Sequence, residues 1–88
     1  MNGISTTILY SGVSFLVQTQ RGGPRAHVIE TLIYLKGRLV YSRKSSFTAL
    51  LEDPDRENRL KRLFREQHQA VLDDIAKGRL DAPLLKSR

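Results

Sequence analysis

The sequence has no cysteine and no tryptophan, and residues 1–20 carry no charged side chain. Without cysteine, neither a disulfide nor a thiolate metal site can reinforce the fold, which excludes the usual cysteine-rich secreted scaffold. No window approaches the roughly 18 apolar residues of a membrane span. The N-terminal residues also lack the basic segment and apolar run of a secretory signal. We therefore expect a cytoplasmic protein with no membrane partner.

The chain has 88 residues, enough for a single domain over residues 1–88. A domain of this size buries roughly 60–65% of the surface of its unfolded chain, so its core is thin. With disulfides excluded, oligomerisation is the remaining common source of stability.

Two pairs of apolar segments flank short turns, Ser11-Gly12 and Lys36-Gly37, as expected for β-hairpins. Strands are predicted at about 5–10, 13–20, 27–35 and 38–44, with a glycine-rich connector between the hairpins. A long helix is predicted at 54–77 and a tail at 79–88. The expected fold class is α+β, a four-stranded antiparallel β-meander followed by a C-terminal helix packed on one sheet face.

The signals for the helix lie at its ends and along one stripe. Asp53 is a good N-cap, Pro54 suits the first helical position, and Gly78 is a common C-terminal stop. Apolar residues recur at three- and four-residue steps. The tail leucines are expected either to pack or to fray: Leu80, Leu84 and Leu85.

The second hairpin is apolar on both faces. With Lys36-Gly37 as the turn, the simplest register places Tyr41 opposite Leu32 and Arg43 opposite Glu30. One helix can cover only one face, and we expect it to cover the aliphatic set: Ile8, Phe15, Val17, Ile29, Ile33, Leu35 and Val40.

The other face then needs a cover, and a second copy of the chain is the simplest one. The candidate interface residues are Leu32, Tyr34, Leu39 and Tyr41. Alternatively, strand twist and the C-terminal leucines close this face within one chain, or the tyrosines present their hydroxyls to water.

No pattern for chemistry is present. His27 and His68 have no partner at metal-ligand spacing, and His68 is expected at the surface. Asp73 and Asp74 point about 100° apart on a helix, so they form no shared-proton dyad. There is no nucleotide-binding glycine motif. We expect no catalytic residue, no cofactor and no metal.

The net charge of +6 is concentrated in residues 21–44, which hold six basic residues against Glu30. Such an excess can attract nucleic acid or an acidic partner; alternatively, it is a solvated surface that keeps the protein soluble. The candidate nucleic-acid residues are Arg21, Arg25, Lys36, Arg38, Arg43 and Lys44.

Three segments, LYSGVSFLVQTQ, VIETLIYLKGRLVYSRKSSF and REQHQAVLDDIAKGRLD, together span most of the chain. With their VQT strand, glycine-turn hairpin ending in Arg-x-Ser and EQH helix, they resemble small uncharacterised bacterial domains of four strands plus a helix. The resemblance implies a bacterial protein and an adaptor or interaction role, and carries no established activity. We therefore expect a non-catalytic interaction or assembly domain, as a homodimer or with an unknown protein partner; the alternative is a nucleic-acid-binding domain that uses the basic hairpin.

Overall fold

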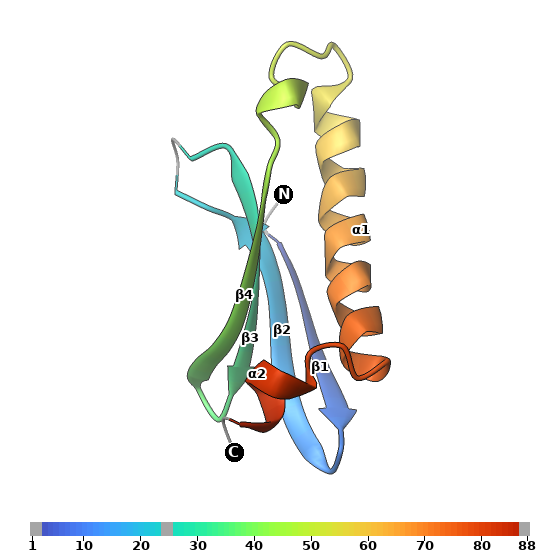
Figure 1. The fold of residues 1–88 in the computed structure, drawn as a ribbon. Coiled ribbons are helices and arrows are strands. Elements are labelled where there is room, and N and C mark those ends of the chain that lie inside the picture. Colours follow the sequence, from blue (N-terminus) through green and yellow to red (C-terminus); the bar gives the residue numbers. More distant parts are fainter. Residues whose placement is uncertain (1–2, 24–25, 87–88) are drawn as a thin grey trace.

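The computed structural model describes residues 3–23 and 26–86, and confirms the predicted α+β class. Four strands form one antiparallel sheet in the order β1-β2-β3-β4, and the long helix α1 lies along one side of it (Figure 1). The strands are β1 Ile4–Tyr10, β2 Val13–Arg21, β3 Val28–Leu35 and β4 Arg38–Ser46. A 3-10 turn η1 at Thr48–Leu50, helix α1 at Arg56–Ala76 and a short helix α2 at Asp81–Leu85 follow.

Both hairpins close through two-residue turns of the type that suits strand twist. Ser11 and Gly12 have φ of 53° and 75°, and Lys36 and Gly37 have φ of 52° and 81°. Positive φ at both central residues defines a type I′ turn, whose twist matches the flanking strands. The predicted turns are therefore correct. The strands run up to two residues beyond their predicted ends, except that β3 begins at Val28, after His27.

The start of α1 differs from the prediction. Its N-cap is Asp55, not Asp53, and Pro54 precedes the helix. The Asp53 carboxylate instead accepts the Asp55 N–H at 2.8 Å, and the Asp53 carbonyl accepts the Arg56 N–H at 3.1 Å. Aspartate side chains favour this kind of local turn. It occupies the Asp53 carboxylate, which would otherwise be available to cap the helix.

The end of α1 is a Schellman motif, as the glycine signal predicts. Gly78 has φ of 76°, its N–H donates to the Ile75 carbonyl at 3.1 Å, and the Arg79 N–H donates to the Asp74 carbonyl at 2.9 Å. The chain then turns into α2, which contacts β4 and accepts a hydrogen bond from Tyr10 of β1 through Asp81. Leu80 and Leu84 are buried, so the described part of the tail packs rather than frays.

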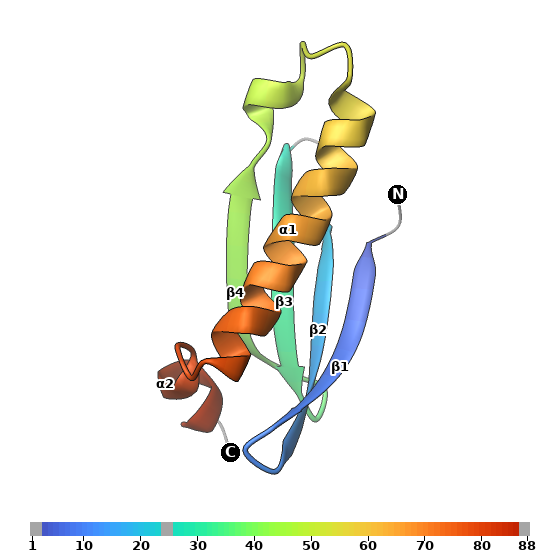
Figure 2. The same cartoon turned by 90° about the vertical axis from the view of Figure 1, so that its right-hand side faces the viewer.

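The core lies between α1 and the face of the sheet that we predicted. Phe15, Val17, Ile29 and Ile33 have no exposed area, and Leu35 is 5% exposed. Helix α1 runs across this face of the sheet (Figure 2). The buried side chains of the sheet meet one stripe of α1, which its three- and four-residue spacing predicts. The buried members of that stripe are Leu60, Phe64, Val71 and Ile75.

Candidate functional site

The opposite face of the sheet carries no helix in the part of the chain that the structure describes, and we refer to it as the open face (Figure 1). The strand register sets its side chains in rows across the four strands, because alternate residues of a strand point to the same side. Three such rows follow from the pairing: Thr7–Leu16–Tyr34–Leu39, then Ser5–Gln18–Leu32–Ser42, then Gln20–Glu30–Lys44.

The first row is the most apolar. A shallow hollow lies along it, and two leucine side chains project in it or beside it. The hollow has a volume of about 480 Å³ and is lined by Thr7, Leu16, Tyr34 and neighbouring residues. Leu9 and Leu39 project on either side of it, on the two edge strands, with 74% and 50% of their areas exposed. These are the two large apolar side chains that are most exposed among the described residues. Leu32, by contrast, is only 9% exposed within a single chain.

The open face carries little charge, although Lys36, in the β3–β4 turn, lines the hollow together with Tyr34. Of the residues in its three rows, only Glu30 and Lys44 carry charge, and their side chains form an ion pair of 3.8 Å. The apolar row therefore has no charged member, although the whole chain has a net charge of +6. Depletion of charge around apolar and aromatic side chains is typical of the centre of a protein interface.

Tyr41 is not on the open face. The register shifts between Ile33 and Tyr34, so that Tyr34 pairs with Leu39 while Ile33 pairs with Tyr41. Val40 is the extra residue of this β-bulge, and it turns every later residue of β4 to the other side. Tyr41 consequently packs against the core under the helices. The structure thus brings Leu32, Tyr34 and Leu39 together and separates Tyr41 from them.

Because of the bulge, the predicted pairing of Glu30 with Arg43 is wrong. Glu30 pairs with Lys44 rather than with Arg43. Arg43 lies on the helix side, where it donates to the Tyr41 hydroxyl at 3.0 Å and to the Asp74 carboxylate at 2.8 Å. The hydrogen bond from Arg43, supported by a second from Arg79, holds the pKa of the Asp74 carboxyl below its ordinary value. Asp74 therefore holds α1 to β4.

The basic residues that we considered for nucleic acid do not share one surface. Lys36 is in the β3–β4 turn and Arg38 follows it, whereas Arg21 ends β2 at the opposite end of the sheet. Lys44 is on the open face and Arg43 is on the helix side. Arg25 lies outside the described residues.

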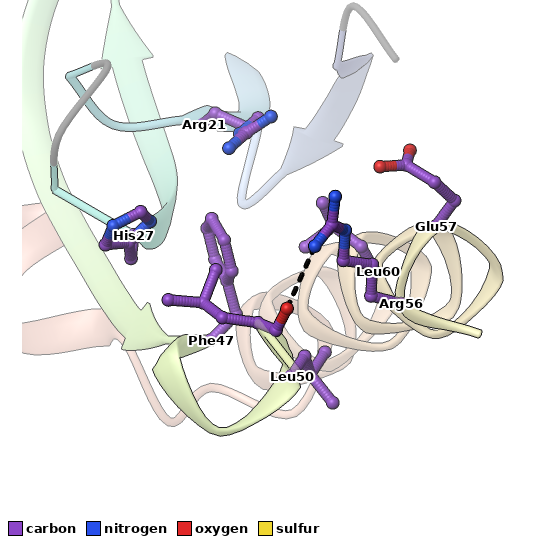
Figure 3. Close-up of a pocket in the computed structure, with 8 residues that line it drawn as sticks. Arg21, His27, Phe47, Leu50, Arg56, Glu57 and Leu60 are labelled. Carbon is purple, nitrogen blue, oxygen red and sulfur yellow. Dashed lines mark hydrogen bonds between the residues drawn. The ribbon is translucent and has the colours of Figure 1, made fainter. Parts of the chain in front are cut away.

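A second pocket, of about 260 Å³, lies at the η1 end of the molecule (Figure 3). The Arg21 guanidinium stands 5.2 Å from the centre of the Phe47 ring, and the His27 ring meets the same ring edge-on at 5.8 Å. The Arg56 guanidinium donates to the Leu51 carbonyl at 2.9 Å. His27 Nδ1 is shielded from solvent and has no hydrogen-bond partner among the described residues. A ligand in the pocket therefore could not reach that nitrogen without movement of the protein.

His68 is buried, and our expectation of a surface histidine is wrong. It is 5% exposed, with Nε2 2.9 Å from the Thr6 hydroxyl and Nδ1 2.7 Å from the Thr19 hydroxyl. Burial lowers the pKa of its imidazole below the ordinary value. Its spacing could have revealed this, since it follows Phe64 by four residues and precedes Val71 by three, on the apolar stripe of α1.

Among residues 3–23 and 26–86 there is no cluster of three or more histidine and acidic side chains that could hold a metal ion. No helix in these ranges is long and apolar enough to cross a membrane. No family model, curated protein or solved structure matches the chain. The resemblance to bacterial four-strand domains therefore gains no support from these comparisons.

Proposed function

We propose that this chain is a small, non-catalytic assembly domain that associates with a second copy of itself through the open face. The observation that carries the proposal is the apolar row Leu16–Tyr34–Leu39, left uncovered on a sheet whose other face is covered by α1 and α2. Exposed apolar surface rimmed by polar residues marks interaction sites on small domains.

The properties of the face favour a second copy as its partner. Two chains of net charge +6 repel one another, and an interface between them is favoured where the charge is lowest. The three rows of the open face meet this condition, because their one ion pair is already neutral and Lys36 lies in the turn beyond the rows. The open face also carries both a hollow and projecting leucines. In a dimer with two-fold symmetry, the leucines of each copy can fit against the hollow of the other.

The size of the face is sufficient for a modest dimer. Four strands of eight residues cover roughly 19 Å by 27 Å, or about 500 Å² on each copy. The total of about 1,000 Å² is near the lower limit for a specific interface. We therefore expect a dissociation constant in the micromolar range rather than an obligate dimer.

Tyr34→Glu and Leu39→Glu test the proposal, because each places a charge without a partner in the apolar row. Both side chains are partly or largely exposed, so the variants should fold. Light scattering over a range of protein concentrations should give the native chain twice the solution mass of either variant, because each variant loses the face interface. Ala49→Glu adds the same charge at an exposed position of η1 and should remain dimeric. A native chain that is monomeric at 100 μM or above would overturn the proposal.

Nucleic-acid binding is the second candidate, and one observation favours it. Lys36, in the β3–β4 turn, lines the hollow together with Tyr34, so a cation stands next to an aromatic ring that could stack on a base, and Arg38 follows the turn. Gel retardation of single-stranded RNA at low salt tests it, with Lys36→Glu/Arg38→Glu as the variant. Retardation that is lost in this variant but kept in Leu39→Glu would favour the second candidate over the first.

A further inference from the structure

Strand β1 is an open edge of the sheet with none of the usual protection. In Figure 2 it forms the right-hand edge, and no described element lies outside it. Its seven residues, Ile4–Tyr10, include no charge, no proline and no glycine. Its pairing with β2 is regular throughout, without a bulge. Natural edge strands normally carry a charge, a proline or a bulge, because each of these hinders pairing with another chain.

The other edge is protected in several ways. β4 has the bulge at Val40, and three basic residues, Arg38, Arg43 and Lys44. Helix α2 also packs against it. The contrast between the two edges identifies β1 as the one available for pairing.

The hairpin determines which backbone groups of β1 face outward. Tyr10 and Val13 flank a two-residue turn, and such a pair exchanges both of its hydrogen bonds across the strands. Alternate residues then bond inward, namely Ile4, Thr6, Ile8 and Tyr10. The N–H and C=O groups of Ser5, Thr7 and Leu9 are therefore directed away from β2.

We propose that β1 pairs with β1 of a second copy, antiparallel and centred on Thr7, in a second interface that rests on the proposed assembly function. Thr7 is the middle residue of β1, and the outward groups of Ser5 and Leu9 are symmetric about it. This register pairs Thr7 with Thr7 and Ser5 with Leu9 of the other copy. It forms six backbone hydrogen bonds about a two-fold axis that is perpendicular to the sheet.

The edge and face interfaces are compatible with each other. Pairing of the β1 edges gives an eight-stranded sheet with α1 of both copies on one side and a continuous open face on the other. Two such sheets then stack through their open faces. The combination is a tetramer with three perpendicular two-fold axes, one of the commonest closed assemblies.

Because the chain has no cysteine, single introduced cysteines test the edge register directly. In the proposed pair, the Cα atoms of the two Thr7 residues are about 5.5 Å apart, within the range of a disulfide. Thr7→Cys should therefore give a covalent dimer under mild oxidation. Ser5→Cys is the matched control, because the two Ser5 residues would be roughly 13 Å apart along the strands. Copies that only stack face to face hold their sheets about 10 Å apart, which is beyond disulfide reach.

We expect at least tenfold faster cross-linking of Thr7→Cys than of Ser5→Cys, in the native background and in Tyr34→Glu. Equal rates for the two cysteine variants would overturn the edge pairing. If the rates are equal while Tyr34→Glu still halves the solution mass, the face interface stands alone. If Thr7→Cys cross-links selectively while Tyr34→Glu leaves the mass unchanged, the edge pairing stands and the face proposal fails.

Discussion

At the scale of single residues, a chain of buried polar groups fixes α1 on the sheet. His68 contacts the Thr19 hydroxyl, which lies 2.8 Å from the Thr31 hydroxyl, and the Gln67 side-chain amide donates to Thr31 at 3.0 Å. Hydroxyls can donate or accept, so a neutral imidazole finds a partner for each nitrogen. Sliding the helix by one residue would leave these buried groups without partners, at a cost of about 1–3 kcal/mol for each.

This network makes stability depend on pH. Burial places the pKa of His68 in the folded chain below its ordinary value of 6.5, so the unfolded chain binds the proton more readily. The contribution of His68 is therefore fully present above pH 6.5 and is lost as the pH falls through 6.5 toward the lower, folded pKa. We expect the free energy of unfolding, measured with urea, to fall between pH 7 and pH 5. His68→Gln, which keeps hydrogen-bonding capacity but cannot titrate, should flatten that slope; an unchanged slope would contradict the assignment.

At the scale of elements, both hairpin turns and the buried face could be predicted, whereas the bulge in β4 could not. Positions 39, 40 and 41 are all apolar, so the pattern fits either register after the turn. Arg43 and Lys44 are adjacent and both basic, so pairing with Glu30 does not distinguish the two registers. One inserted residue reverses the face of everything after it. For this reason Tyr41 was expected on the open face, while Tyr34, before the bulge, was placed correctly.

The junction between α1 and α2 depends on Gly78. A Cβ there would lie 3.3 Å from the Asp81 carboxylate and 3.4 Å from the Tyr10 hydroxyl, at a φ of +76°. The hydroxyl of Tyr10 donates to Asp81 at 2.7 Å, so both contacts belong to one docked corner. Gly78→Ala should cost about 1–2 kcal/mol of stability for the left-handed backbone, with a further loss from this contact. Gly23→Ala, whose added Cβ would meet none of the described atoms within 4 Å, should be nearly neutral in the same urea titration.

At the scale of the whole molecule, the hydrophobic core lies on one face of the sheet only. One helix and a short second one cover a single face of a four-stranded sheet, and the molecule extends over 44 × 22 × 20 Å. Association is a common source of stability for a small domain with an apolar face unburied and no disulfide. In the proposed dimer, assembly and folding stability are linked by mass action, because only the folded chain presents the open face.

This linkage predicts a melting temperature that depends on protein concentration. For a dimer, a tenfold rise in concentration adds about 0.7 kcal/mol for each chain, which corresponds to roughly 3–5 °C for a domain of this size. Calorimetry on the native chain between 10 and 1,000 μM should show this rise. Leu39→Glu should melt at a lower temperature that depends less on concentration over the same range, whereas Ala49→Glu should follow the native chain. Because Leu39 is half exposed and packs little within one chain, a concentration-independent melting temperature for all three proteins would mean that the open face contributes nothing through association.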